Sequence, residues 1–132
     1  MLKLAAILLS FLLILSAARA ADGIAPIEVS MIQLIANPEK FDGKKVILTG
    51  FMNLEFEGNA LYFHRDDFVY GQMKNGLGLT LSEQGTKSAS RWSKNYVRVE
   101  GVFNAREAGH FGMYSGSIEQ VTRITGLGRR PK

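Results

Sequence analysis

The chain has 132 residues, no cysteine and a formal net charge of +4 at pH 7. This length is enough for one domain with a single hydrophobic core. The absence of cysteine excludes disulfides, a cysteine nucleophile and a lipid-modified cysteine at a processed N-terminus. The fold must therefore be held together by packing alone.

The first twenty residues have the layout of a secretory signal peptide. A charged start at Lys3 precedes an apolar run over residues 4–17, and Ala18-Arg19-Ala20 forms a small-x-small cleavage motif. The apolar run is shorter than the stretch of about 20 residues that spans a bilayer. A membrane anchor or a buried helix is the alternative. We expect cleavage after Ala20, export to the periplasm or the medium, and no stable membrane anchor afterwards.

The positive charge lies mainly at the two ends of the chain. Residues 21–122 carry ten basic and twelve acidic residues, whereas the last ten residues contain Arg123, Arg129, Arg130 and Lys132. A slightly acidic body has no electrostatic footprint for phosphates, which argues against nucleic acid as the ligand. Residues 125–132 are predicted to be a solvated, flexible basic tail.

The first element after a short leader over residues 21–28 is a predicted helix. Ser30 is placed to cap a helix over residues 31–37, whose apolar face consists of Met31, Leu34 and Ile35. Pro38 should end or kink this helix. The Asp42-Gly43 pair then predicts a turn, after which the hydrophobic period changes to two.

A long strand is predicted from residue 45 onward. Its apolar face comprises Val46, Leu48, Met52, Leu54 and Phe56. Its polar face comprises Lys45, Thr49, Asn53, Glu55 and Glu57. Gly50 interrupts the apolar face, as glycine does where a strand bends or bulges.

Four further strands are predicted at residues 60–64, 77–81, 97–105 and 115–124, with a short helix or loop over residues 66–74. Residues 97–102 repeat the character of residues 46–51, with a glycine at the same place. Strands that bend in this way favour a small closed barrel. We therefore predict a mostly β domain over residues 29–124, a five-stranded antiparallel OB-like barrel with a short helix before its first strand. A small open β-sandwich is the alternative.

Three segments carry a family resemblance: residues 34–46 (LIANPEKFDGKKV), 54–62 (LEFEGNALY) and 112–116 (GMYSG). Together they resemble a group of small exported bacterial proteins, largely uncharacterised, with an OB-fold-like barrel. The resemblance covers most of residues 29–124 and implies the fold, whereas a nucleic-acid function would be an analogy from the fold alone. The OB plan also implies a helix between the third and fourth strands. That helix would have to come from residues 82–94, which are polar and have little apolar periodicity.

Six residues are candidates for ligand contact: Glu55, Glu57, Asn59, Tyr62, His64 and Tyr114. Glu55 and Glu57, two apart on a strand, would project about 7 Å from each other. Such a pair could serve a glycosidase or a calcium site. The favoured interpretation is a solvated strand face followed by a Gly-Asn turn.

His64-Arg65-Asp66-Asp67 is the densest polar run in the chain. Histidine beside carboxylates can act as a base or a metal ligand. However, neighbouring strand residues point to opposite faces, so His64 and Arg65 should not converge. Asp66 is expected to cap the following turn or helix. His110 would contribute to a site only if the fold brought it near His64.

The aromatic residues form a thin stacking platform of mixed charge, and their expected role is packing at the barrel ends. The sequence has no Gly-x-Ser-x-Gly turn, which leaves an acid-only hydrolase as the one enzymatic alternative. We predict an exported, non-catalytic binding module without cofactor or metal, whose ligand is a protein or a small molecule. The alternatives are a weak binder of single-stranded nucleic acid or another polyanion, and an inhibitor or immunity-type partner of an exported enzyme.

Overall fold

The computed structural model describes residues 23–128. The predicted signal peptide with its cleavage site, the first two leader residues and the last four residues of the basic tail lie outside this range. None of the helices within residues 23–128 has the length and apolar character needed to cross a membrane.

The N-terminal segment forms a short strand and two short helices. β1 (Ile27–Glu28) comes from residues predicted as leader, and it pairs in parallel with the next strand. The predicted helix is confirmed as α2 (Met31–Ala36), because the Ser30 Oγ accepts a hydrogen bond from the Gln33 amide at 3.1 Å. A second helix, α3 (Pro38–Phe41), starts with proline at its first position, where no amide hydrogen is needed.

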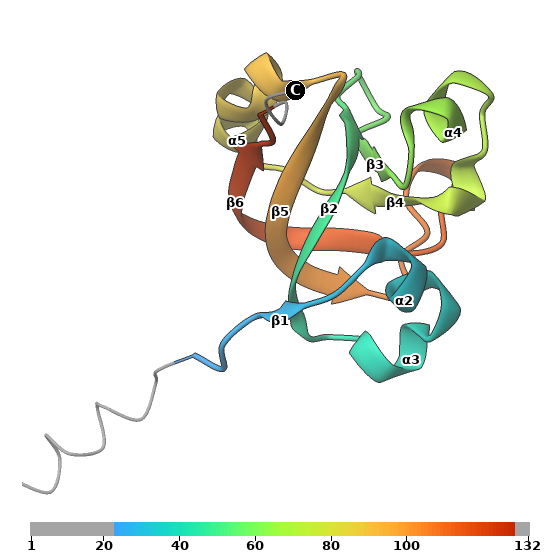
Figure 1. The fold of residues 1–132 in the computed structure, drawn as a ribbon, viewed down its shortest axis with the longest axis vertical. Helices are drawn as coiled ribbons and strands as arrows, with labels where there is room; N and C mark the ends of the chain where they lie inside the picture. Colours follow the sequence, from blue (N-terminus) through green and yellow to red (C-terminus); the bar gives the residue numbers. More distant parts are fainter. Residues whose placement is uncertain (1–22, 129–132) are drawn as a thin grey trace, which may run out of the picture.

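The predicted closed barrel is confirmed. Its five strands are β2 (Lys45–Asn53), β3 (Ala60–Tyr62), β4 (Gly76–Leu79), β5 (Asn95–Asn104) and β6 (Ser117–Gly126). They are ordered β2-β3-β4-β6-β5, and β5 pairs back onto β2 (Figure 1). The prediction of an entirely antiparallel sheet is wrong, since β4 and β6 run parallel. A closed ring with an odd number of strands cannot alternate direction throughout, so one parallel pair is unavoidable.

The two matching segments pair with each other in the β2–β5 ladder. Gly50 lies opposite Val97, and Gly101 lies opposite Val46. At Gly101 the predicted irregularity is confirmed, because the pairing of β5 with β6 shifts register there. Gly50 has a different role, since β2 stays in register and the missing side chain makes room for β3.

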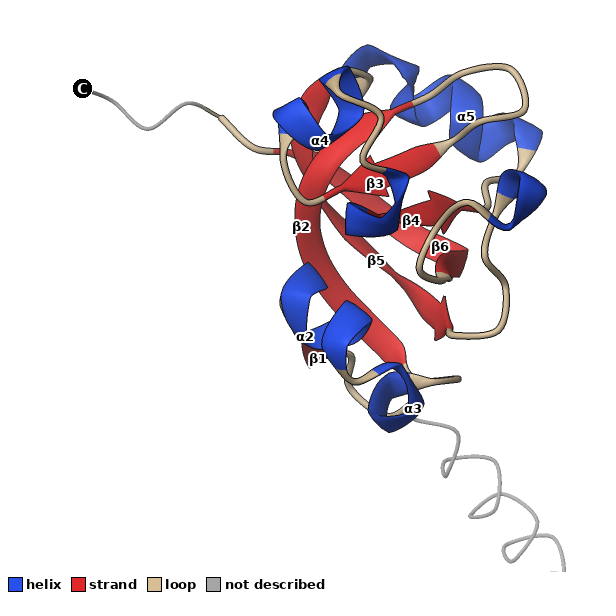
Figure 2. Ribbon diagram, turned by 90° about the vertical axis from the view of Figure 1, so that its right-hand side faces the viewer, coloured by secondary structure: helices blue, strands red, loops and turns tan. Residues whose placement is uncertain are grey.

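The remaining helices connect the barrel strands. They are α4 (Arg65–Val69), α5 (Glu83–Ala89) and the 3₁₀ turns η1 (Met73–Asn75), η2 (Ser90–Trp92) and η3 (His110–Gly112). α5 lies between the third and fourth barrel strands, at the opposite end of the barrel from α2 and α3 (Figure 2). It begins at a Ser82 cap, whose Oγ accepts from the Gly85 amide at 3.0 Å.

The barrel interior is apolar, as Val46, Leu48 and Met52 predicted. Beyond Met52 the predicted alternation is wrong at Asn53 and Phe56, because β2 ends at Asn53, whereas Leu54 packs against the core as predicted. Asn53 is buried, and Phe56 lies in the following loop with 95% of its surface exposed. A second cluster, outside the main core, is built from Phe51, Ala60, Tyr62 and Tyr114.

Candidate functional site

Two loops that are distant in sequence meet at one cleft of about 370 Å³. The first loop, residues 54–59, joins β2 to β3, and the second, residues 105–116, joins β5 to β6. We call this hollow the loop cleft. Its walls also include the end of β4 and the start of β6, and its lining residues are Glu57, Gly58, Asn59, Gly78, Leu79, Thr80, Leu81, Glu107, Gly109, His110 and Ser117.

An asparagine side chain shapes each loop. The Asn59 Oδ1 accepts a hydrogen bond from the Glu55 amide at 3.2 Å. The Asn104 Oδ1 accepts from the amides of Arg106 and Glu107 at 3.0 and 3.2 Å. Asparagine favours such turns because its short side chain can bond the neighbouring backbone. Both walls of the cleft are therefore held by local hydrogen bonds.

Glycine allows the second loop to pack closely on the barrel. Gly109 has φ +67°, and a β-carbon there would lie 2.6 Å from Cδ2 of Tyr114 and 3.4 Å from the Cα of Gly78. Lys74 ties the same loop to η1, because its Nζ donates to the carbonyls of Gly112 and Tyr114 at 3.2 and 3.3 Å. The second loop is thus anchored at both sides of its tip.

The loop cleft combines two carboxylates with a buried hydroxyl. Glu57 and Glu107 come from different loops, and His110 lines the same cleft. Ser117 is only 1% exposed, and its Oγ has no hydrogen-bond partner among the described residues. A buried hydroxyl without a partner costs about 1–3 kcal/mol. A ligand group that bonded this hydroxyl would recover part of that cost.

Exposed phenylalanines stand next to the cleft on both loops. Phe56 precedes Glu57 and is 95% exposed, and Phe111 follows His110 and is 85% exposed. Phe111 also has φ 54°, a left-handed conformation that is costly for a bulky residue. The two most exposed phenylalanines of residues 23–128 thus lie at the tips of the loops that form the cleft.

The structure brings only two of the six predicted contact residues into this cleft, Glu57 and Asn59. Glu55 lies in the same loop but outside the cleft lining, and the predicted strand face shared by Glu55 and Glu57 is wrong because the strand ends before them. The side-chain oxygen of Asn59 is already used to hold the loop.

Tyr62 and Tyr114 are structural residues beneath the surface. Their hydroxyl oxygens lie 3.2 Å apart and their rings pack edge to face at 6.1 Å. Burial raises the pKa of Tyr62 far above its ordinary value, and the hydrogen bond with Tyr114 adds to the rise. Both side chains are buried, so contact with a ligand is not open to them.

His64 belongs to another part of the surface. Its Nδ1 lies 3.4 Å from the Tyr96 hydroxyl, which also accepts from the Arg65 amide at 3.1 Å. His64 lines a separate hollow beside β1, whereas His110 lines the loop cleft. The prediction that Asp66 caps the next helix is wrong, because α4 begins at Arg65 and His64 is its N-cap. The carboxylate that bonds the N-cap is that of Asp67, whose Oδ2 accepts from the His64 amide at 2.9 Å.

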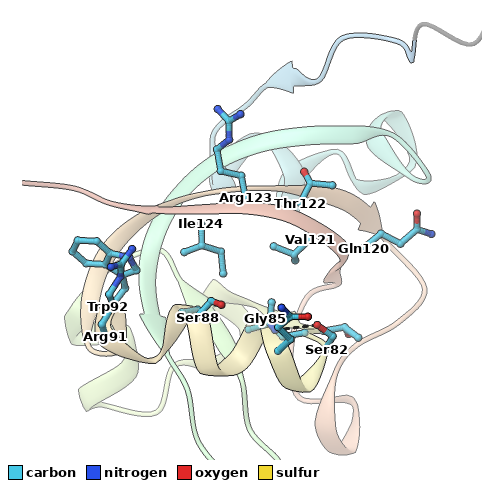
Figure 3. A pocket seen from close by; sticks show the side chains of 14 residues that line it. Ser82, Gly85, Ser88, Arg91, Trp92, Gln120, Val121, Thr122, Arg123 and Ile124 are labelled. Atoms are coloured by element: carbon cyan, nitrogen blue, oxygen red, sulfur yellow. Dashed lines mark hydrogen bonds between the residues drawn. The ribbon is translucent and has the colours of Figure 1, made fainter.

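A groove between α5 and β6, of about 690 Å³ and so larger than the loop cleft, was not predicted from the sequence (Figure 3). We call it the helix groove. It is lined by Thr80, Leu81, Ser82, Gln84, Gly85, Ser88, Ala89, Arg91, Trp92, Gln120, Val121, Thr122, Arg123 and Ile124. The run of small residues in 82–94 was a usable signal, because a helix built from such side chains fills little space against a barrel.

Within residues 23–128, no three His, Cys, Asp or Glu side chains are grouped so that they could hold a metal ion. Ser117 and His110 share the loop cleft, but no hydrogen bond joins them, as an activated serine nucleophile would require. Comparison with known protein families, characterised proteins and solved structures finds no match to this chain.

Proposed function

We propose that this protein is an exported, non-catalytic binding module with an OB-like barrel, and that its loop cleft binds a protein partner. The OB-like assignment is supported by the order of the barrel strands, the parallel β4–β6 pair and the helix between the third and fourth strands. OB folds commonly use the loops that correspond to residues 54–59 and 105–116. Export is supported by the N-terminal sequence pattern.

The observation that carries the proposal is the pair of exposed phenylalanines beside the cleft. Aromatic side chains surrounded by polar groups are typical anchors of protein–protein interfaces. Phe56 and Phe111 offer two such anchors on separate loops, and Glu57 and Glu107 of the same two loops line the cleft. A partner surface with an apolar patch and a lysine or arginine side chain would match this arrangement.

The same charges weigh against the polyanion alternative at this site. Two carboxylates in the cleft repel phosphate groups. The aromatic cluster of Phe51, Tyr62 and Phe68 is packed at ring-centroid distances of 5.6–5.8 Å, so these rings are used in the fold rather than offered to bases.

The test is affinity capture from a periplasmic extract of the native host, with three proteins compared. The wild type and a control variant, Val69→Ser with Tyr70→Ser at the C-terminal end of α4, should retain one partner in nearly stoichiometric amount. Val69 and Tyr70 are a matched pair of exposed apolar residues away from the cleft. The variant Phe56→Ser with Phe111→Ser should lose that partner.

With the partner in hand, Glu57→Lys combined with Glu107→Lys should weaken the purified complex at least tenfold. Capture that is equal for all three proteins would refute the proposal, as would turnover of a glycan or phosphoester that depends on Glu57. If the captured partner is an exported enzyme that loses activity in the complex, the protein acts as an inhibitor or immunity-type partner of that enzyme.

A further inference from the structure

The neighbours of Ser117 in the sheet leave its hydroxyl without a hydrogen-bond partner. Ser117 pairs with Gly78 of β4 on one side and with Asn104 of β5 on the other. Gly78 has no side chain. The Asn104 side chain is already in use, because its Oδ1 accepts from two amides of its own loop and its Nδ2 donates to a carboxylate oxygen of Glu119 at 3.1 Å. Neither neighbour therefore bonds the Ser117 hydroxyl.

The Ser117 side chain lies on the face of the sheet that looks toward the second loop. Side chains of residues that are paired across a sheet lie on the same face. A β-carbon added to Gly78 would lie 3.1 Å from the Cα of Gly109 in the second loop and 3.6 Å from the Cβ of Ser117. Gly78, Gly109 and Ser117 all line the loop cleft. The unpaired hydroxyl therefore belongs to the floor of this cleft.

The charge of the loop cleft is negative. Glu57 comes from the first loop and Glu107 from the second, and neither forms an ion pair within residues 23–128. The residues that line the cleft include no lysine and no arginine. Among the described residues, the two carboxylates and His110 are not grouped so that they could hold a metal ion. The cleft therefore favours a cationic group that carries several hydrogen-bond donors over a metal ion.

We infer that the loop cleft holds the ammonium group of a lysine side chain of the protein partner, and that Ser117 is the residue that selects lysine. This inference rests on the proposed function, because it names the chemical group that the same cleft recognises. An ammonium is a compact charge whose three N–H groups can reach separate acceptors. The Ser117 Oγ would accept one of them, and the carboxylates of Glu57 and Glu107 would attract the charge.

Arginine fits the same groups less well than lysine. Its planar guanidinium presents its donors in a rigid fork, which matches the two oxygens of one carboxylate. At the floor of the cleft the acceptor is the single hydroxyl oxygen of Ser117, so only one arm of the fork could bond it. An acidic side chain would be repelled by Glu57 and Glu107.

The backbone of Glu57 offers a way to remove one of these charges without weakening the fold. Its φ is 62°, a left-handed conformation that asparagine adopts more readily than glutamate. Glu57 also makes no ion pair within residues 23–128. Glu57→Asn should therefore keep or raise the thermal stability while it lowers the negative charge of the cleft. Weaker binding by this variant would then report on the charge alone.

The experiment titrates the chain that begins at Ala21 with Nα-acetyl-lysine amide and follows the amide signals by NMR. The probe is small, so its dissociation constant should lie in the millimolar range. Signals of residues 57–59, 78–80 and 107–110 should shift. Nα-acetyl-arginine amide should bind at least fivefold more weakly. Nα-acetyl-norleucine amide, whose side chain is unbranched and uncharged, should not bind.

Ser117→Ala should weaken binding of the lysine probe about fivefold without loss of thermal stability, because it removes a buried hydroxyl that has no partner. Ser88→Ala on α5 is the matched control outside the cleft and should alter the affinity less than twofold. Glu57→Asn should weaken the probe about fivefold. Glu39→Gln on α3 removes the same charge elsewhere and should alter the affinity less than twofold.

The titration also separates this inference from the proposed function. Phe56→Ser with Phe111→Ser should lose the captured partner but keep the affinity for the lysine probe within threefold. Binding of the probe without capture of any partner would refute the proposed function and uphold the lysine selectivity of the cleft. Capture of a partner that Ser117→Ala leaves unchanged, with no binding of the probe, would uphold the proposed function and overturn the inference.

Three further results would overturn the inference. They are equal or tighter binding of the arginine probe, binding of the lysine probe that Ser117→Ala does not weaken, and binding of the free diamine cadaverine more than tenfold tighter than the lysine probe. The last result would identify a free diamine, rather than a lysine side chain, as the occupant of the cleft.

Discussion

A β-carbon added to Gly50 would lie 2.7 Å from Cγ of Leu61, the residue that β3 inserts against the middle of β2. It would also lie 2.7 Å from the Tyr62 carbonyl oxygen. Because the second contact is with backbone, a side-chain rotation cannot relieve it. The spacing of β2 and β3 thus depends on the missing side chain at position 50.

Gly50→Ala should therefore lower the free energy of unfolding by about 2–3 kcal/mol, toward the upper end of the range for overpacked cores. Urea denaturation measures the loss. Gly58→Ala is the control, because the nearest atoms to its added β-carbon are 3.8 Å away. An equal effect of the two substitutions would show that β3 does not press on Gly50.

The raised pKa of Tyr62 predicts a loss of stability in alkali. An unfolded tyrosine loses its proton near pH 10, whereas the buried Tyr62 keeps its proton to a higher pH. Above about pH 10 the unfolded state therefore binds fewer protons than the folded state, and the free energy of unfolding falls by up to about 1.4 kcal/mol per pH unit. Below pH 10 this contribution is fully retained.

Urea titrations between pH 8 and pH 11 measure this slope. Tyr62→Phe should flatten it and, at pH 8, cost about 1 kcal/mol for the lost hydrogen bond with Tyr114. Tyr70→Phe is the control, since Tyr70 is 75% exposed and its removal should leave the slope intact. A slope that persists in Tyr62→Phe would assign it to another group.

The left-handed backbone of Phe111 predicts a substitution that stabilises the fold. Asparagine tolerates positive φ better than phenylalanine does, and Phe111, 85% exposed and packed against the His110 ring, buries little surface. Phe111→Asn should raise the free energy of unfolding by about 0.5–1 kcal/mol. Phe56→Asn, at a position without positive φ, should give no gain. If the loop cleft binds a protein, both variants should bind it less tightly than the wild type.

The sequence pattern at the N-terminus predicts a processed product. When the full chain is expressed in a Gram-negative host, intact-mass measurement of the periplasmic fraction should give a protein that begins at Ala21. Replacement of both Ala18 and Ala20 by glutamine should block processing, because the cleavage site requires small residues. Ala17→Gln is the matched control. Recovery of uncleaved wild-type chain in the membrane would favour an anchor.

The fold was largely predictable because its signals are local. Ser30 capped the expected helix, and Val46 and Leu48 marked the interior face of β2. The direction of β6 relative to β4 was not predictable from periodicity, since alternation is the same in parallel and antiparallel strands. The end of β2 was missed because Leu54 and Phe56 continue the alternation after the pairing has stopped.

The candidate site was less predictable than the fold. Glu57 and His110 line one cleft only because the β5–β6 connection returns to the loop after β2, an arrangement that depends on the whole barrel. The burial of Tyr62 could not be predicted from the alternation of apolar and polar residues, since both faces of the short strand β3 are buried. The helix groove is the space that the small side chains of α5 leave between the helix and β6. The spacing of residues in the sequence does not predict the volume of such a space.

The pairing of β2 with β5 also has a consequence for how fast the protein folds. The β2–β5 ladder runs from the Lys45–Val102 pair to the Met52–Asn95 pair. In the sequence, β3, β4 and α5 all lie between these two strands. Bringing the two ends of so long a stretch of chain together costs conformational entropy, and this cost comes before the contacts of the ladder can stabilise the fold. We expect closure of this ladder to limit the folding rate, so Gly50 and Gly101, which shape its two halves, should influence the speed of folding as well as the final stability.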